Sequence, residues 1–312
     1  MALYSVLDIK QIEELTASFQ IDAITSFKVL HGGSENTNYR VNTTIGSYVL
    51  TICEQKTQRE ANQLALLLEY LELEGFRTSR IIRSTTKELL TFWEDKPVML
   101  KEYIDGIIME EMTPAVLKLV GIELGRLHKI SAPPYLPITV GYGLESFQQI
   151  EKYANGSSFQ QWLLDIERYI NEYLTSDMPK VLAHSDLFYN NVVVSSTENR
   201  VTIMDFEEAT HYYRVFDLGM TIVGSCQIKG VIDLKSAESF LRGYLKEVTL
   251  TEKELNGLKA FTVYAAAATS FWRHKQYHYT APDPSMSNHY LKMKELADAI
   301  MALPDDCFSK AL

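Results

Sequence analysis

Residues 184–191 read HSDLFYNN, and this polar stretch lies between two apolar runs, VLA at 181–183 and VVV at 192–194. Short apolar, β-branched runs predict buried strands, so HSDLFYNN is expected to form a loop between them. The loop holds a histidine, a carboxylate and a carboxamide. Because loops on a rigid scaffold carry many catalytic groups, this composition indicates a chemical site.

Another apolar run, VTIM at 201–204, follows VVV after the turn-like sequence SSTENR. Together VVV and VTIM predict a β-hairpin that starts after Asn191 and ends at Asp205. Antiparallel pairing returns the chain to its starting edge, so we expect Asp186, Asn191 and Asp205 to converge. Carboxylate and carboxamide oxygens suit Mg²⁺, which predicts a metal site at Asn191 and Asp205. Asp186 is then left to act on a substrate hydroxyl.

The composition limits the class of protein. With 312 residues, 46% of them hydrophobic, the chain can bury a large core and is expected to be one bilobed unit or two domains. The formal net charge of -10 and the scattered basic residues argue against nucleic acid or an anionic membrane as a partner.

Cysteine usage and hydropathy predict where the protein resides. The three cysteines are far apart and outside any metal or disulfide spacing: Cys53, Cys226 and Cys307. This pattern indicates a reducing compartment. The start, MALYSVLDIK, has no basic region, and no apolar run is long enough for a membrane span. We therefore expect a cytoplasmic protein.

The two parts of the chain are built differently. Helices are expected at 8–20 and around Leu64–Leu71, with short strands at 27–30, 37–44, 47–54, 88–94 and 97–103. After the cap pair Thr113-Pro114 the pattern becomes helical, with further helices expected near 159–174, 236–247, 251–277 and 287–302. The predicted fold is α+β, with an antiparallel-sheet N-terminal lobe (1–101) interrupted by one helix and a mostly helical C-terminal lobe (102–312).

The spacing H-x-D-x-x-x-x-N, followed by a second Asp after a hairpin, is that of the kinase catalytic loop. The chain resembles the aminoglycoside phosphotransferase and choline kinase superfamily, with its bilobed protein-kinase-like fold, and within it the type II homoserine kinases. The motifs that carry this resemblance are GGSENTNY (32–39), YVLTICE (48–54), KEYIDG (101–106), GIELGRLH (121–128), HSDLFYNN, MDFEE (204–208) and FDLG (216–219). It spans about Phe27 to His278.

The resemblance implies ATP and Mg²⁺ as cofactors and a nucleotide site in the first lobe. It places the hairpin tip Gly32, Gly33 and Ser34 on the phosphates. It places the strand residues Val49 and Thr51 near the adenine and the phosphates, and the backbone of Glu102, Tyr103 and Ile104 on the adenine edge.

One position departs from the family pattern. Thr51 stands where these kinases usually carry a phosphate-binding Lys, so a cation such as Arg40 or Lys56, or the metal, has to neutralise the phosphates. Glu60 fits the position of the glutamate that pairs with that Lys, and it equally fits a solvated carboxylate at a helix start.

Other residues are expected to support the loop. The resemblance implies that His184 braces the loop and Asp205, and that Asp217 anchors the loop backbone; a helix N-cap is the alternative for Asp217. His128 is expected to be structural. Ser185 stands where small-molecule relatives commonly carry Gly.

The sequence favours a small-molecule hydroxyl substrate, because only residues 206–216 separate Asp205 from Asp217 and no A-P-E signature follows. For homoserine, the candidates for binding the carboxylate are Arg273, with His274 and Lys275 beside it, and a solvated helix face is the alternative for these three. The candidates for the ammonium group are Glu207, Glu208 and Asp105. Choline, ethanolamine and aminoglycosides stay open as substrates, because aromatic residues such as Trp272 and Tyr277 lie near Arg273. A nucleotide-binding pseudokinase also stays open because of Thr51.

Overall fold

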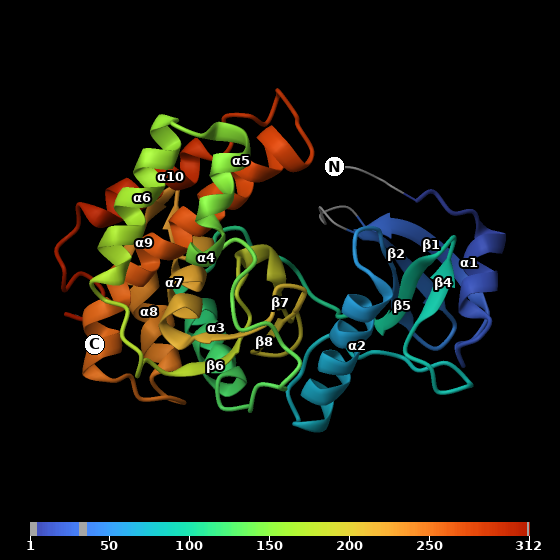
Figure 1. The fold of residues 1–312 in the computed structure, drawn as a ribbon. Helices are drawn as coiled ribbons and strands as arrows, with labels where there is room; N and C mark the ends of the chain where they lie inside the picture. Colours follow the sequence, from blue (N-terminus) through green and yellow to red (C-terminus); the bar gives the residue numbers. More distant parts are fainter. Residues whose placement is uncertain (1–4, 31–35, 311) are drawn as a thin grey trace. The chain divides into compact units, whose positions relative to one another are not determined.

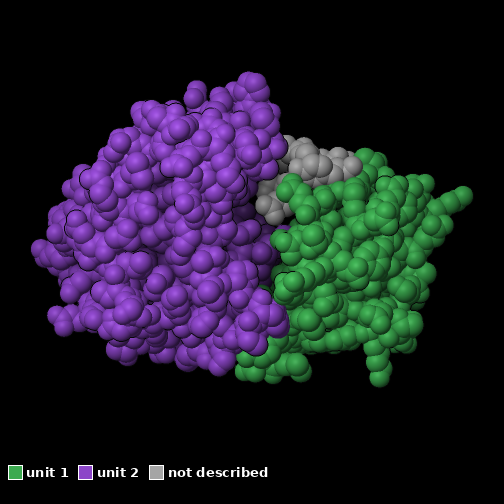
Figure 2. All heavy atoms as spheres, viewed as in Figure 1, with its two compact units in different colours: residues 1–105 green, residues 106–312 purple. Residues whose placement is uncertain are grey.

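The structure is a computed structural model that describes residues 5–30, 36–310 and 312. It divides into two compact units, residues 1–105 (unit 1) and residues 106–312 (unit 2), coloured separately in Figure 2. The division falls after Asp105, whereas the sequence placed it after Lys101. Unit 1 is built mostly from sheet and unit 2 mostly from helix, as expected.

Unit 1 contains a five-stranded antiparallel sheet in the order β1-β2-β3-β5-β4 (Figure 1). All five strands coincide with expected ones: β1 Ile24–Leu30, β2 Asn36–Thr43, β3 Ser47–Cys53, β4 Thr91–Trp93 and β5 Lys96–Glu102. The unit also carries the expected inter-strand helix, α2 (Gln58–Leu73), and a second helix, α1 (Ile9–Thr16), which matches the opening helix.

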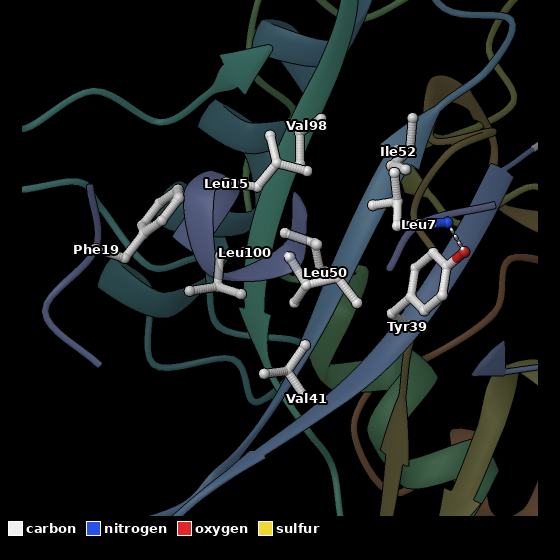
Figure 3. Packing of buried hydrophobic residues seen from close by; sticks show 10 residues of the cluster. Leu7, Leu15, Phe19, Tyr39, Val41, Leu50, Ile52, Val98 and Leu100 are labelled. Carbon is white, nitrogen blue, oxygen red and sulfur yellow. Dashed lines mark hydrogen bonds between the residues drawn. The ribbon is translucent and has the colours of Figure 1, made fainter. Parts of the chain in front are cut away.

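One face of this sheet forms the core of unit 1. Because side chains alternate along a strand, Tyr39, Val41, Leu50 and Ile52 all lie on this face, where α1 covers them (Figure 3). The Tyr39 hydroxyl accepts a hydrogen bond from the Leu7 N–H at 2.8 Å and donates one to a backbone carbonyl 2.8 Å away. The opposite face of β3 is thereby left to present Val49 and Thr51.

Unit 2 is built around helices whose starts the sequence largely predicted. The helices that match expected ones are α3 (Pro114–Leu127), α6 (Ser158–Asn171), α8 (Leu234–Tyr244), α9 (Glu252–Lys275) and α10 (Leu291–Met301). The short α4 (Leu144–Phe147) and α5 (Glu151–Ala154) were not expected. The Thr113 side chain caps α3, and Thr251 and Glu254 form a capping box at the start of α9. None of the helices among the described residues has the length and apolarity needed to cross a bilayer.

Both interpretations of Asp217 implied a helix start nearby, but the sequence patterns did not indicate the bounds of α7 (Arg214–Ser225). Residues 215–225 are all buried, and the two glycines and several β-branched residues of this stretch lower its helix propensity. It packs against α9 and carries Asp217 in its first turn. Its N-cap residue is Tyr213, which rules out the N-cap alternative for Asp217.

The expected hairpin of unit 2 is confirmed. β7 (Val192–Val194) pairs antiparallel with β8 (Val201–Ile203), and β6 (Lys180–Ala183) pairs with β9 (Thr210–Tyr213). A further two-stranded ribbon joins β10 (Gln227–Ile228) to β11 (Val231–Ile232). The HSDLFYNN loop therefore connects β6 to β7, and the segment with Asp205 connects β8 to β9.

Candidate active site

The start of the loop is fixed by a buried carboxylate on α7. One oxygen of Asp217 accepts a hydrogen bond from the His184 N–H at 2.7 Å, and the other accepts one from the Ser185 N–H at 2.8 Å. Asp217 is fully buried, so these N–H donors replace the water it has lost. Asp217 thus holds the backbone at the start of the loop in place.

His128, at the end of α3, is the third partner of Asp217. Its Nε2 lies 3.0 Å from the carboxylate, and its Nδ1 lies 2.8 Å from the Tyr244 hydroxyl. Burial alone raises the pKa of the Asp217 carboxyl, but the hydrogen bonds from His128 and His184 outweigh burial and hold that pKa below its usual value. Asp217 is therefore a carboxylate at neutral pH, and His128 has a structural contact, as expected.

Asn191 ties the end of the loop to its middle. Its Nδ2 donates to the Asp186 backbone carbonyl at 2.8 Å and lies 3.5 Å from the Asp186 carboxylate. Its own carbonyl accepts from the Met204 N–H at 2.9 Å, across the foot of the hairpin. Because the amide nitrogen is occupied by the loop, the amide oxygen of Asn191 is the atom left to bind a ligand.

Asp205 follows directly after Met204 and has a left-handed backbone, with φ at 68°. Asp tolerates this region better than most residues, and such conformations gather at functional sites. The side chain is exposed, and among the described residues the carboxylate has no hydrogen-bond or ion-pair partner. It is therefore available to a cation.

His184 links the loop to the Asp205 segment. Its Nδ1 lies 3.3 Å from the Asp186 N–H and so accepts from it, which leaves the proton on Nε2 to donate to the Met204 carbonyl at 2.9 Å. The buried ring of Phe206 packs on His184 with ring centroids 4.9 Å apart. These contacts lie where the brace inferred from the sequence requires them.

The Asn191 and Asp205 oxygens suit a magnesium ion. Both are hard oxygen donors, Asn191 is oriented by its amide nitrogen, and the Asp205 carboxylate is unpaired within the described chain. Among the described residues no group of three His, Cys, Asp or Glu side chains could hold a metal by itself. An ion here therefore needs further ligands such as water or phosphate oxygens, as Mg²⁺ commonly has.

Arg273 lies near the C-terminal end of α9, close enough to Asp186 for their charges to interact. Burial lowers the pKa of the Arg273 guanidinium, and the charge of Asp186 and the nearby Tyr277 act in the opposite direction. The guanidinium has no hydrogen bond or ion pair to any described residue. Glu207 is half-buried in the turn after Asp205.

The expected nucleotide residues of β3 lie on the sheet face opposite the unit 1 core. Val49 pairs with Arg40 on one side and with Lys101 on the other. Thr51 is fully buried, and its hydroxyl donates to the Asn38 side chain at 2.7 Å. Thr51 is thus a satisfied neutral group.

Arg40, a candidate to replace the missing Lys, and Glu60, at the position of its glutamate partner, both have other contacts. The Arg40 guanidinium lies 3.9 Å from the centre of the Tyr103 ring and bonds the Asn42 and Ser47 side chains. Glu60 accepts from the N–H and hydroxyl of Thr57 as the capping-box carboxylate of α2. Of the two interpretations of Glu60, the helix-start carboxylate is the one observed.

Two of the three N–H groups of the linker residues have backbone partners. The Glu102 N–H donates to the Arg80 carbonyl at 2.8 Å, and the Tyr103 N–H donates to the Ser47 carbonyl at 3.0 Å. The Ile104 N–H makes no backbone hydrogen bond to a described residue. Gly32, Gly33 and Ser34, the expected phosphate loop, lie outside the described residues.

Comparison with known proteins identifies the family. The model of the APH family, described as a phosphotransferase enzyme family, matches residues 26–253. The chain belongs to this phosphotransferase family. A homoserine kinase of Paramagnetospirillum magneticum is 24% identical over 297 residues, which cover 90% of this chain and 90% of that relative.

Solved structures of other kinases have the same fold as this chain. A microcompartment-associated aminopropanol kinase matches 98% of this chain and 100% of its own, with a TM-score of 0.74 at 16% identity. The amicoumacin kinase hAmiN, in complex with AMP-PNP, Ca²⁺ and Ami, matches 96% of each chain with a TM-score of 0.73 at 16% identity. The protein-kinase-like α+β fold predicted from the sequence is confirmed, and the chain is a small-molecule phosphotransferase.

Two site-supporting residues had no signal in the sequence. Tyr142 and Thr210 both contact Ser185 of the loop, yet neither lies in a recognisable motif. Thr210 could have been inferred only from the pairing of β9 with β6, which places it opposite Ala183. Tyr142 lies in an irregular segment before α4, where no periodicity guides an inference.

Proposed function

We propose that this phosphotransferase transfers the γ-phosphate of ATP to the hydroxyl of a small amino acid that resembles homoserine. The observation that carries the proposal is the loop itself. Asp186 lies in a loop anchored by Asp217, with Asn191 bonded to its backbone carbonyl and an unpaired Asp205 carboxylate at the foot of the same hairpin. This is the set of groups that phosphoryl transfer uses.

Asp186 is the proposed catalytic carboxylate. It would accept a hydrogen bond from the acceptor hydroxyl, orient its oxygen toward the γ-phosphorus and take its proton as the new bond forms. Its half-buried side chain and the fixed backbone around it support this role.

Asn191 and Asp205 are the proposed ligands of Mg²⁺. The solved amicoumacin kinase holds AMP-PNP and Ca²⁺, which supports a nucleotide and a divalent ion in this fold. When bound, the ion would offset the negative charge of the phosphates during transfer. Of the common divalent ions, Mg²⁺ best fits two oxygen ligands that leave room for water and phosphate.

Unit 1 supplies the proposed nucleotide contacts. Val49 would pack on the adenine, and the Ile104 N–H, which lacks a backbone partner within the described chain, would donate to the adenine edge. Since Thr51 is neutral and Arg40 is engaged beside Tyr103, the metal and Lys56 remain to neutralise the phosphates, with the backbone of Gly32, Gly33 and Ser34 as additional donors.

Arg273 is the proposed partner of the acceptor carboxylate. A guanidinium binds a carboxylate through two parallel hydrogen bonds, and the Arg273 guanidinium is near enough to Asp186 to interact with its charge. Glu207 is the proposed partner of the acceptor ammonium group. The homoserine kinases among the relatives support an amino acid as the acceptor class.

A panel of matched acceptors tests this function. Homoserine is compared with 3-amino-1-propanol, which lacks the carboxylate, and with 4-hydroxybutanoate, which lacks the ammonium group; choline, ethanolamine and kanamycin complete the panel. Acceptor-dependent ADP formation from Mg-ATP is measured for each. We expect the highest kcat/KM with homoserine. Preference for an acceptor without a carboxylate overturns the amino-acid assignment, and nucleotide binding without turnover on any acceptor favours the pseudokinase alternative.

A further inference from the structure

Ser185, the residue before the proposed catalytic Asp186, has a strained backbone. Its φ is 69°, in the left-handed region that non-glycine residues rarely adopt, and the residue is completely buried. A conformation of this kind persists only where the surroundings hold it in place. The contacts of Ser185 therefore show what determines the shape of the loop.

Each polar group of Ser185 has a partner on a different element. Its N–H donates to Asp217 on α7 at 2.8 Å, and its carbonyl accepts from the Tyr142 hydroxyl at 2.6 Å. Its hydroxyl lies 2.7 Å from the Thr210 hydroxyl at the start of β9. Tyr142 and Thr210 are themselves buried, so no water competes for these bonds.

These contacts fix the orientation of the peptide group that joins Ser185 to Asp186. Tyr142 holds the carbonyl of this peptide, and His184 Nδ1 accepts from its N–H at 3.3 Å. With both edges held, the peptide plane cannot rotate freely. A side chain leaves the backbone in a direction set by the adjoining peptide planes. The orientation of the Asp186 carboxylate therefore depends on the plane of the Ser185–Asp186 peptide.

The segment that carries Tyr142 is itself held in place. The neighbouring Leu144 N–H donates to the Tyr264 hydroxyl at 2.8 Å, and the Pro137 carbonyl accepts from the N–H of His211 on β9 at 2.8 Å. Gly143 lies so close to the Tyr264 hydroxyl that a Cβ atom there would clash. The Tyr142 hydroxyl is thus pre-positioned for the Ser185 carbonyl.

We propose that Tyr142 and Thr210 are positioning residues for phosphoryl transfer, which hold Ser185 in its left-handed conformation and so aim the Asp186 carboxylate at the acceptor hydroxyl. The inference rests on the proposed function for its effect on rate. A small displacement of a catalytic group is enough to slow a reaction by orders of magnitude. The loss of one of these contacts is therefore expected to lower kcat.

Tyr142→Phe removes a single hydroxyl, and Tyr39→Phe is its matched control. Tyr39 is a buried tyrosine with two hydroxyl hydrogen bonds, and it packs in the unit 1 core. We expect Tyr142→Phe to lower kcat by roughly 10- to 100-fold with little change in the KM for ATP. Tyr39→Phe should lower stability and leave kcat unchanged.

A second set of variants tests the contact between the two hydroxyls. Thr210→Val removes the hydroxyl while keeping the volume, and Thr210→Ser retains the hydroxyl. We expect Thr210→Val to lower kcat about tenfold and Thr210→Ser to restore it. Ser185→Gly accepts the left-handed backbone without strain and should keep a higher kcat than Ser185→Ala.

Amide hydrogen exchange of the peptide covering 182–190 separates the inference from the proposed function. Tyr142→Phe should speed exchange in this peptide, whether or not an acceptor is known. If wild-type protein phosphorylates none of the acceptors, the proposed function fails and exchange still decides the positioning role. Unchanged exchange in Tyr142→Phe, or wild-type kcat in both Tyr142→Phe and Thr210→Val, overturns the inference.

Discussion

At the scale of single residues, Asp205 gives the clearest test of the metal assignment. Asp205→Asn removes the negative charge and keeps a residue that tolerates the left-handed φ of 68°, whereas Asp205→Ala adds backbone strain. We expect Asp205→Asn to lower kcat at least about 100-fold, because the charge that holds the ion is lost. Steady-state rates with saturating Mg-ATP measure the effect.

The control for Asp205 is Asp165→Asn on α6. Asp165 is an exposed carboxylate that contacts Arg168 and Gln161 on its own helix. We expect that variant to keep wild-type turnover and both variants to keep the wild-type free energy of unfolding within roughly 0.5 kcal/mol. Near-normal turnover in Asp205→Asn contradicts the metal assignment.

Arg273 decides whether the acceptor carries a carboxylate. Arg273→Ala removes the guanidinium, and Arg273→Lys keeps the charge without the paired donors. We expect Arg273→Ala to raise the KM for homoserine by at least roughly tenfold and to leave the KM for 3-amino-1-propanol within about twofold. Acceptor titrations at saturating ATP measure both. An equal rise for the two acceptors shows general damage to the pocket and contradicts the assignment.

Residue spacing predicted which residues the hairpin would bring together, and it could not predict the partners of the other candidate side chains. The sequence places Asn191 and Asp205 at the two ends of one hairpin, which the β7–β8 pairing confirms. It left two interpretations of Glu60 open, although Thr57 and Glu60 have the T-x-x-E spacing of a capping box. Nor could it reveal that Arg40 packs on Tyr103, since that contact joins a strand to a distant linker.

At the scale of elements, the packing of α3 on α8 depends on a glycine. A Cβ atom at Gly121 would lie 2.6 Å from the Tyr244 backbone nitrogen and closer still to the Phe240 carbonyl. We expect Gly121→Ala to destabilise the fold by roughly 1–3 kcal/mol, because neither backbone atom can move aside. Gly141→Ala is the matched control, since a Cβ atom there meets nothing within 4 Å. Urea unfolding measures both, and equal stabilities contradict the account.

The contact between α9 and α6 predicts a pH dependence of stability. His274 on α9 is 6% exposed and stacks on Phe159 of α6 at 4.3 Å between ring centroids. Burial, aided by the nearby His278, lowers the pKa of His274 from 6.5 to about 4. The folded state therefore favours neutral His274. The stability that His274 contributes is complete above pH 6.5 and is lost as the pH falls toward 4.

His274→Phe keeps the aromatic stacking and removes this titration. We expect wild-type protein to lose up to about 3 kcal/mol more than His274→Phe between pH 7.5 and 4. Urea unfolding of both proteins across this range measures the difference. Parallel stability curves for the two proteins contradict the lowered pKa.

Most of the elements that the sequence revealed show a regular hydrophobic period or a clear start signal. Strands β1 to β5 and helices such as α3 show the expected periods of two and 3.6 residues. The bounds of helix α7 stayed hidden because its glycines and β-branched residues favour a helix weakly. The segment with Tyr142 stayed hidden for a different reason: its conformation is set by bonds to Tyr264 and to β9 rather than by a local pattern.

At the scale of the whole molecule, the change from strand-like to helix-like sequence patterns along the chain predicted the division into a sheet unit and a helical unit. The boundary itself is four residues later than expected, at Asp105, because the strand-like pattern that marked the end of the first lobe stops before the compact unit does. The residues proposed for the nucleotide belong to unit 1, and those proposed for the chemistry belong to unit 2.

The central claim is that the Asp186 carboxylate carries out phosphoryl transfer while other groups bind the nucleotide. The most direct measurement is a rapid-quench single turnover of wild-type protein and Asp186→Asn, both saturated with Mg-ATP and the preferred acceptor. We predict that Asp186→Asn lowers the rate of transfer by at least about 100-fold and leaves the Kd for ATP unchanged. A wild-type transfer rate, or a loss of ATP binding that parallels the loss of rate, would contradict the claim.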